Sequence, residues 1–148
     1  YCLHGAEISN YFTELAEDVE AACYGSYFLE FADYYCRENV DGRELLLLLY
    51  QSMRALLKPA LPDHLVKLVF ELRAMAANGE YTEDPPRPVS ESAVYAWQYT
   101  ISAPLESLYT FVLKPEVERE FRVCVEINKK KFVDRTFHSL EILELMIR

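Results

Sequence analysis

The sequence predicts an all-α protein, folded as a single bundle of about six helices. Two observations support this prediction. Apolar residues recur at intervals of three and four over most of the chain, and short stretches with proline, glycine or asparagine separate the segments that have this spacing. The 148 residues, 51% of them hydrophobic, are enough for the core of one domain, which we expect to span residues 1–148.

The first two predicted helices differ in how much of their circumference is apolar. From Phe12 to Arg37, apolar or small side chains follow one face, and Gly25 among them indicates a close approach by another helix, because glycine lowers helix stability by about 1 kcal/mol relative to alanine. Residues 39–42 are typical of a turn. The helix over residues 43–57 contains five consecutive leucines, which is typical of the most buried helix of a bundle.

The third helix has the clearest signals at both ends. Pro62 and Asp63 are residues that favour a helix start, and Asn78-Gly79 favours a helix end. Between them, Lys67 and Glu71 stand four positions apart, so we expect an ion pair on the outer side of this helix, worth a few tenths of a kcal/mol.

Three further helices are predicted in the second half of the chain. Residues 80–89 hold three prolines and are expected to form a loop, after which Ser90 or Ser92 caps a helix that continues to about residue 101. A short helix begins with Pro104 at a first-turn position and continues to about Tyr109. A long one begins at Lys114-Pro115 and continues to residue 132, with Asn128 as the polar member of its apolar stripe.

We expect Ser139 to cap a final helix, Leu140 to Met146. The chain begins at Tyr1 without a leader, and we interpret it as a piece of a longer protein or as a processed chain. Its longest apolar run has six residues, far short of the roughly 20 that a membrane-spanning helix needs, so no membrane partner is expected.

Charge is distributed unevenly along the chain. The net charge is −9, but residues 1–40 hold eight acidic residues against one basic residue, while residues 114–148 hold seven against eight. Binding to phosphates depends on lysine and arginine, so the first third is a poor surface for nucleic acid and an anionic partner should contact the later part. We expect DNA binding by this chain alone to be weak.

No motif for a cofactor, a metal or a catalytic reaction is found. The four cysteines are scattered without a Cys-x-x-Cys pair, which favours free thiols and no zinc. The histidines are isolated, and the carboxylates of residues 14–20 lack the Glu-x-x-His pairs of di-iron bundles, so a solvated helix face is the better interpretation. We therefore expect no enzyme activity. The eleven tyrosines favour buried rings with hydroxyls at the rim over base stacking.

Two groups of basic residues are candidate binding sites. The first is a docking patch for an acidic tail or for phosphates, with a solvated helix end as the alternative; its members are Arg122, Lys129, Lys130, Lys131 and Arg135. The second borders the apolar stripes of the second and third helices and consists of Arg54, Lys58, Lys67 and Arg73. A cation beside an apolar cleft suits a peptide that ends in an aromatic residue and a free carboxylate, although ordinary surface charge is the alternative.

Four segments, in this order, resemble the C-terminal helical domain of the bacterial DNA-repair protein RecO. They are residues 17–30, Val69-Phe70-Glu71-Leu72-Arg73, Ser102-Ala103-Pro104-Leu105-Glu106 and Ser139-Leu140-Glu141 within 132–143. The resemblance covers nearly the whole chain but not the N-terminal OB-fold of that family. Many members carry a four-cysteine zinc module after the helix with Phe70-Glu71-Leu72-Arg73, whereas no cysteine lies between Gly79 and Ser90 here, so no zinc is expected.

The resemblance implies a recombination mediator of the bacterial cytoplasm, associated with the nucleoid. With RecR and often RecF, such proteins act on DNA coated by single-stranded-DNA-binding protein, anneal complementary strands and help to load RecA. It implies as partners the acidic, phenylalanine-ended tail of the coating protein, RecR, and DNA through the full-length protein. An alternative is a helical regulator that binds a small molecule in a deep apolar cavity lined by Tyr95, Trp97 and Tyr99.

Overall fold

A computed structural model describes residues 19–37, 42–133 and 137–146. Within these ranges there are six α-helices, one short 3-10 helix and no strand, which confirms the all-α prediction. The elements are α2 (Val19–Arg37), α3 (Gly42–Leu56), α4 (Asp63–Ala77), α5 (Glu91–Ser102), η1 (Leu105–Ser107), α6 (Pro115–Phe132) and α7 (His138–Met146). The predicted start of the first helix at Phe12 lies outside the described residues.

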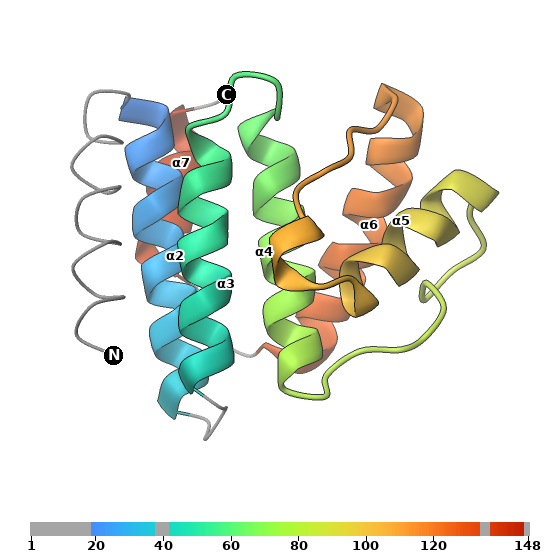
Figure 1. The fold of residues 1–148 in the computed structure, drawn as a ribbon, viewed down its shortest axis with the longest axis horizontal. Helices are drawn as coiled ribbons and strands as arrows, with labels where there is room; N and C mark the ends of the chain where they lie inside the picture. The colour runs from blue at the N-terminus through green and yellow to red at the C-terminus, as the bar shows by residue number, and fades with distance from the viewer. Residues whose placement is uncertain (1–18, 38–41, 134–136, 147–148) are drawn as a thin grey trace.

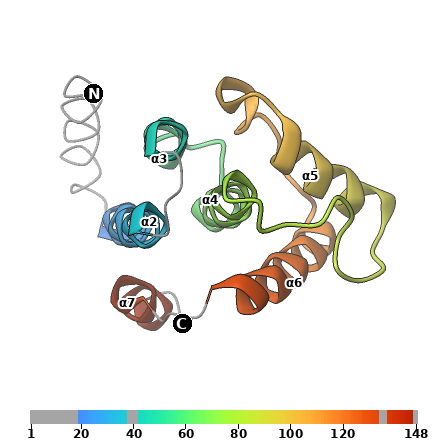
Figure 2. The same cartoon turned by 90° about the horizontal axis from the view of Figure 1, so that it is seen from below.

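The helices α2, α3 and α4 run side by side, and α5 and α6 lie beyond α4 (Figure 1). Figure 2 shows α7 and α6 on the same side of this layer, α7 against α2 and α6 against α4. Among the described elements, α7 packs on α2 alone. No contact between α6 and α7 is found among the described elements.

Helix α4, and not α3, is the central helix of the bundle. It packs against α2, α3, α5 and α6, and nine of its 15 residues are buried, against seven of 15 in α3. The prediction from the leucine run of residues 43–57 was wrong because Leu46 and Leu47 stay partly exposed, on a side of α3 that no described helix fully covers.

Aromatic rings join α2 to α4 and α7. The Phe28 and Phe70 rings stack with centroids 4.3 Å apart. The Phe137 ring lies edge-on to the Tyr27 ring, with centroids 5.6 Å apart, and is tilted against the Phe31 ring at 5.3 Å. Such pairs add about 0.5–1.5 kcal/mol each beyond their burial. Phe137, just before α7, thus fixes the last helix on α2.

The segment between α4 and α5 is held by side chains from α5 and α6. Gly79 has a positive φ of 75°, and the amides of Gly79 and Glu80 donate to carbonyls of the last turn of α4 at 2.9 Å each, which closes that helix as predicted. The Asn128 amide donates to the Glu80 carbonyl at 3.0 Å, and the Trp97 indole N–H donates to the Thr82 carbonyl at 2.8 Å.

Ser90 caps α5, as predicted, because its hydroxyl accepts from the Ala93 amide at 3.3 Å. The same hydroxyl donates to Glu120 of α6 at 2.7 Å, so the loop is anchored at both ends to α6. After η1, the Tyr109 and Ser52 hydroxyls share a hydrogen bond that ties this segment to α3.

Two predicted helix starts are corrected. The short helix is the 3-10 helix Leu105–Ser107, with Pro104 as its N-cap and not a residue of its first turn. The last helix already includes His138, so Ser139 lies within α7 and is not its cap. Within the described residues, no helix has both the length and the apolar composition needed to cross a bilayer.

Candidate binding groove

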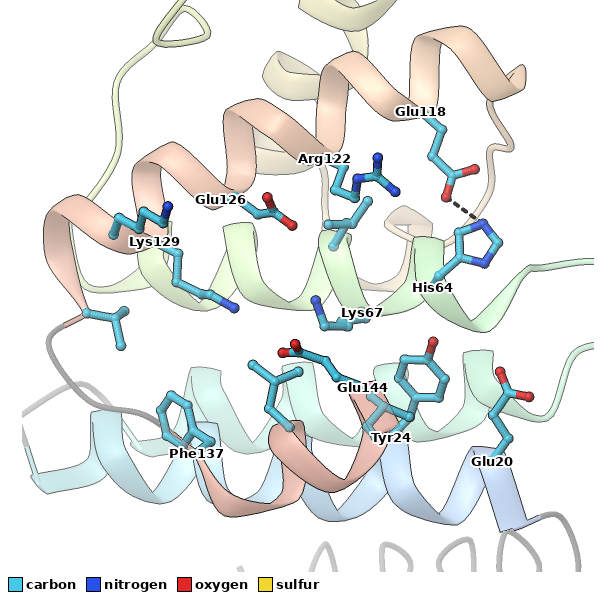
Figure 3. A pocket seen from close by; sticks show the side chains of 15 residues that line it. Glu20, Tyr24, His64, Lys67, Glu118, Arg122, Glu126, Lys129, Phe137 and Glu144 are labelled. Carbon is cyan, nitrogen blue, oxygen red and sulfur yellow. Dashed lines mark ion pairs between the residues drawn. The ribbon is translucent and has the colours of Figure 1, made fainter. Parts of the chain in front are cut away.

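A groove of about 800 Å3 lies between α6 and α7, with α2 and α4 as its floor (Figure 3). Its apolar lining is contributed by Tyr24, Leu68, Val133, Phe137, Leu140 and Leu143. Its polar lining is contributed by Glu20, His64, Lys67, Glu118, Arg122, Glu126, Lys129, Lys130 and Glu144. This volume lies within the range of roughly 300–1,000 Å3 that ligand sites have.

The two ends of the groove differ in chemistry. At one end, Lys129 of α6 lies near Phe137 at the start of α7 (Figure 3). At the other end, Glu118, His64 and Glu20 face one another across the first turns of α6, α4 and α2. One end is therefore basic and apolar, and the other is acidic.

His64 and Glu118 close the acidic end. The His64 Nε2 atom lies 2.6 Å from a carboxylate oxygen of Glu118, which joins the N-terminal turns of α4 and α6. The His64 side chain is 60% exposed, so this contact lies at the mouth of the groove and not in its floor.

A buried carboxylate lies beneath the floor at the basic end. Glu71 of α4 has no exposed surface, yet it is charged and has three partners from three helices. The Lys129 Nζ atom lies 2.7 Å from one of its oxygens and the Lys67 Nζ atom lies 3.3 Å from the other. The Tyr27 hydroxyl of α2 donates to the same oxygen as Lys129. The predicted pair of Lys67 and Glu71 is present, but inside the protein and not on an outer surface.

The pKa shifts in this cluster determine which of its groups are ionised at neutral pH. Burial alone would raise the pKa of Glu71, but the ammonium groups of Lys67 and Lys129, with hydrogen bonds from Lys129 and Tyr27, lower it below its ordinary value of 4.5. Burial and the Glu71 charge raise the pKa of Tyr27 well above 10.0. At neutral pH the carboxyl is therefore ionised, and the phenol keeps its proton.

Both ammonium groups also lie over the face of the Tyr27 ring. The Lys129 and Lys67 Nζ atoms are 5.7 and 5.8 Å from the ring centroid, within the range of cation–π attraction. The two side chains are only 18% and 16% exposed, so their heads reach the groove from its floor. The cluster of Tyr27, Lys67, Glu71 and Lys129 is called the buried tetrad below.

The sequence is similar to a known protein family over roughly its first half. The family model described as "Recombination protein O C terminal" matches residues 16–83. This part of the chain belongs to the RecO C-terminal family. The match covers α2, α3 and α4, which include three members of the tetrad, and the family is one of recombination proteins. No curated protein and no solved structure matches the chain.

The structure places four residues of the two predicted basic groups around this one groove. Lys67 comes from the second predicted group, and Arg122, Lys129 and Lys130 come from the first. The Lys131 ammonium lies over the Phe132 ring, 5.1 Å from its centroid, and Lys131 does not line the groove. Arg135 lies outside the described residues.

The second predicted group does not form one surface. Arg73 is six positions from Lys67, roughly 240° around the helix, and donates to the carbonyls of Thr100 and Ala103 at 3.1 and 2.6 Å. Its role is therefore to bind the end of α5. The Arg54 guanidinium lies 5.7 Å from the centroid of the Tyr50 ring, and Lys58 is exposed after the end of α3.

The aromatic residues expected to line a cavity for a small molecule do not line this groove. Trp97 is fully buried with its N–H bound to the loop, whereas Tyr95 is 70% exposed and stacks on Tyr99 at 6.1 Å. Within the described ranges there is no group of three or more His, Cys, Asp or Glu residues with the arrangement of a metal site.

Sequence reasoning missed Glu71 and Phe137 as site residues. The signal for Glu71 was its position in Val69-Phe70-Glu71-Leu72, because a charge between strongly apolar neighbours, with a lysine four positions before it, indicates a buried pair. No comparable local signal existed for Phe137, because its place at the groove depends on how α7 returns onto α2.

Proposed function

We propose that this domain is a non-catalytic docking module of a bacterial recombination mediator, acting in the RecFOR pathway of DNA repair. Its partner is the acidic tail of single-stranded-DNA-binding protein, which ends in phenylalanine and a free carboxylate. Docking of that tail supports displacement of the coating protein, strand annealing and RecA loading. Membership of the RecO C-terminal family supports the pathway, and the groove supports the binding mode.

The observation that carries this proposal is the pairing of an apolar wall with lysines at one end of the groove. Leu140 and Val133 are partly exposed and provide contacts for an aromatic ring, the buried Phe137 ring supports this wall, and Lys129 and Lys67 line the same groove. Burial of a phenylalanine side chain contributes about 1.5–3 kcal/mol. Charge-assisted hydrogen bonds to its carboxylate add to this and fix its orientation.

The remaining charges set the direction of the bound tail. Glu20 and Glu118 would repel acidic residues, so the tail should leave the groove on the side of Arg122 and Lys130, both exposed on α6. In the described part of the chain, neither of these two residues makes an ion pair, so their charges are available to a ligand. We expect micromolar affinity, which corresponds to about −8 kcal/mol.

Fluorescence anisotropy with a labelled acidic peptide that ends in Pro-Phe tests this proposal. We expect binding that weakens with salt, and weaker binding when the terminal carboxylate is amidated. Arg122→Ala should reduce the affinity severalfold, whereas Lys131→Ala, a change of the same charge outside the groove, should not. Absence of salt-sensitive binding by the folded chain would refute the docking role.

A further inference from the structure

Among the described residues, Glu71 is the only charged side chain that is buried from solvent. It does not line the groove, but it accepts from both lysines that do so at the basic end. The two ammonium groups contact different oxygens of one carboxylate, which holds them close together. The three charged groups together have a net charge of +1. This charge balance has a consequence for ligand choice.

We infer that Glu71 is a specificity-determining residue that makes the groove accept a single carboxylate and reject a polyphosphate chain. It acts through Lys67 and Lys129, by holding their Nζ atoms in the floor and by neutralising one of their two charges. The inference rests on the proposed function in taking this groove as the docking site.

The surrounding charges point the same way. Among the described residues, four basic and four acidic side chains line the groove, and the acidic ones are Glu20, Glu118, Glu126 and Glu144. When the charge of Glu71 beneath the floor is added, these described residues carry no net positive charge, although the end with Lys67 and Lys129 is locally positive. Binding of a nucleic-acid backbone gains affinity from each phosphate that a cation neutralises, and this groove offers few unopposed cations. One carboxylate on an apolar residue needs only the local positive end.

The geometry leaves the lysines able to bind one anion. Each ammonium has three N–H donors, and contact with Glu71 uses one donor of each. Lys129 also lies 3.3 Å from the Tyr27 hydroxyl oxygen. Donors remain on both lysines for a carboxylate that arrives from the groove. Without Glu71, the long side chains would extend toward solvent and keep two full charges.

Glu71→Gln is the variant that tests this inference, because glutamine keeps the shape and can still accept from the Tyr27 hydroxyl. Glu116→Gln is the control, since it makes the same change in net charge at an exposed position in the first turn of α6 that does not line the groove. For each variant, the affinity for the acidic peptide and for a single-stranded oligothymidylate is measured between 50 and 200 mM salt.

We expect Glu71→Gln to gain affinity for oligothymidylate and to keep its peptide affinity within about threefold. One further phosphate contact steepens the salt dependence of single-strand binding by about 0.7 in log–log slope, which corresponds to a gain of about eightfold at 50 mM salt and about threefold at 200 mM. Glu116→Gln should change neither slope. Identical oligothymidylate slopes for the wild type and Glu71→Gln would overturn the inference.

A second readout needs no ligand, and its wild-type measurement does not depend on whether the variant folds. In the wild type, acetylation followed by mass spectrometry should modify Lys67 and Lys129 more slowly than the exposed Lys130. In folded Glu71→Gln the two rates should rise toward that of Lys130. Equal rates for all three lysines in the wild type would overturn the inference. A wild type that binds no peptide but shows these rate differences would instead refute the proposed function alone.

Discussion

Removal of the Lys129 ammonium should destabilise the fold by about 3 kcal/mol at pH 7. In Lys129→Met the apolar part of the side chain is kept, but Glu71 loses the partner at 2.7 Å. Breaking a buried ion pair by removing one partner costs about 3–5 kcal/mol. We expect the lower end because Lys67, at 3.3 Å, and the Tyr27 hydroxyl remain. For a domain of this size, 3 kcal/mol corresponds to a decrease in Tm of about 6–12 °C.

The pH dependence separates this mechanism from a simple packing defect. In the wild type, the folded-state pKa of Glu71 lies below its ordinary value of 4.5, so its stabilising contribution is complete above that pH and is lost as the pH falls through the folded-state pKa. In Lys129→Met, we expect the burial of Glu71 to raise the pKa of its carboxyl above the ordinary value, because one of the two ammonium groups that lower it is gone. Ionisation of Glu71 then lowers the free energy of unfolding as the pH rises. The difference in unfolding free energy between the two proteins should therefore shrink in acid.

Urea unfolding, followed by circular dichroism and by the fluorescence of the buried Trp97, measures this difference between pH 3 and pH 7. Lys130→Met is the matched control, because it removes the same charge from an exposed neighbour and should change stability by less than about 0.5 kcal/mol. The reasoning is refuted if Lys129→Met costs the same at both pH values, or if the two variants cost the same.

Three further predictions concern contacts that place the elements around the groove. Ser90→Ala should cost about 1 kcal/mol, since it removes the cap of α5, whereas exposed Ser92→Ala should leave the urea midpoint nearly unchanged. Asn128→Leu should cost about 1–3 kcal/mol in the same assay, because the Glu80 carbonyl loses its side-chain donor. Arg73→Met should lower Tm by several degrees, since two carbonyls at the end of α5 lose a charged donor; an unchanged Tm would contradict this.

The helices were predictable from sequence because their signals are local. Apolar spacing and terminal residues placed α4 and its glycine end, and Ser90 at the start of α5, with small errors. The central helix was missed because the prediction relied on the five consecutive leucines of α3, although α4 is the more apolar helix over its whole length. Which helix has neighbours on all sides also depends on how the chain folds back, and a run of leucines does not show this.

The groove was predictable only in part for the same reason. The basic residues of α6 were found because they are consecutive, but Lys67 was grouped with Arg73, which points to another side of α4. Helical periodicity alone separates these two positions by roughly 240° around α4, so the sequence already contained this information. The burial of Glu71 depends on Tyr27 and Lys129, which are 44 and 58 positions away in the chain. Contacts at this separation leave little trace in one sequence.

The two walls of the groove are supported differently. The α6 wall packs on α4 and α5, and it also holds both ends of the loop through Asn128 and Ser90. The α7 wall, among the described elements, packs on α2 alone. Amide hydrogens of α7 should therefore exchange with solvent through local opening, at a lower free energy than those of α6. A ligand that contacts Leu140 of α7 would slow that exchange, so deuterium uptake in α7 reports occupancy of the groove directly.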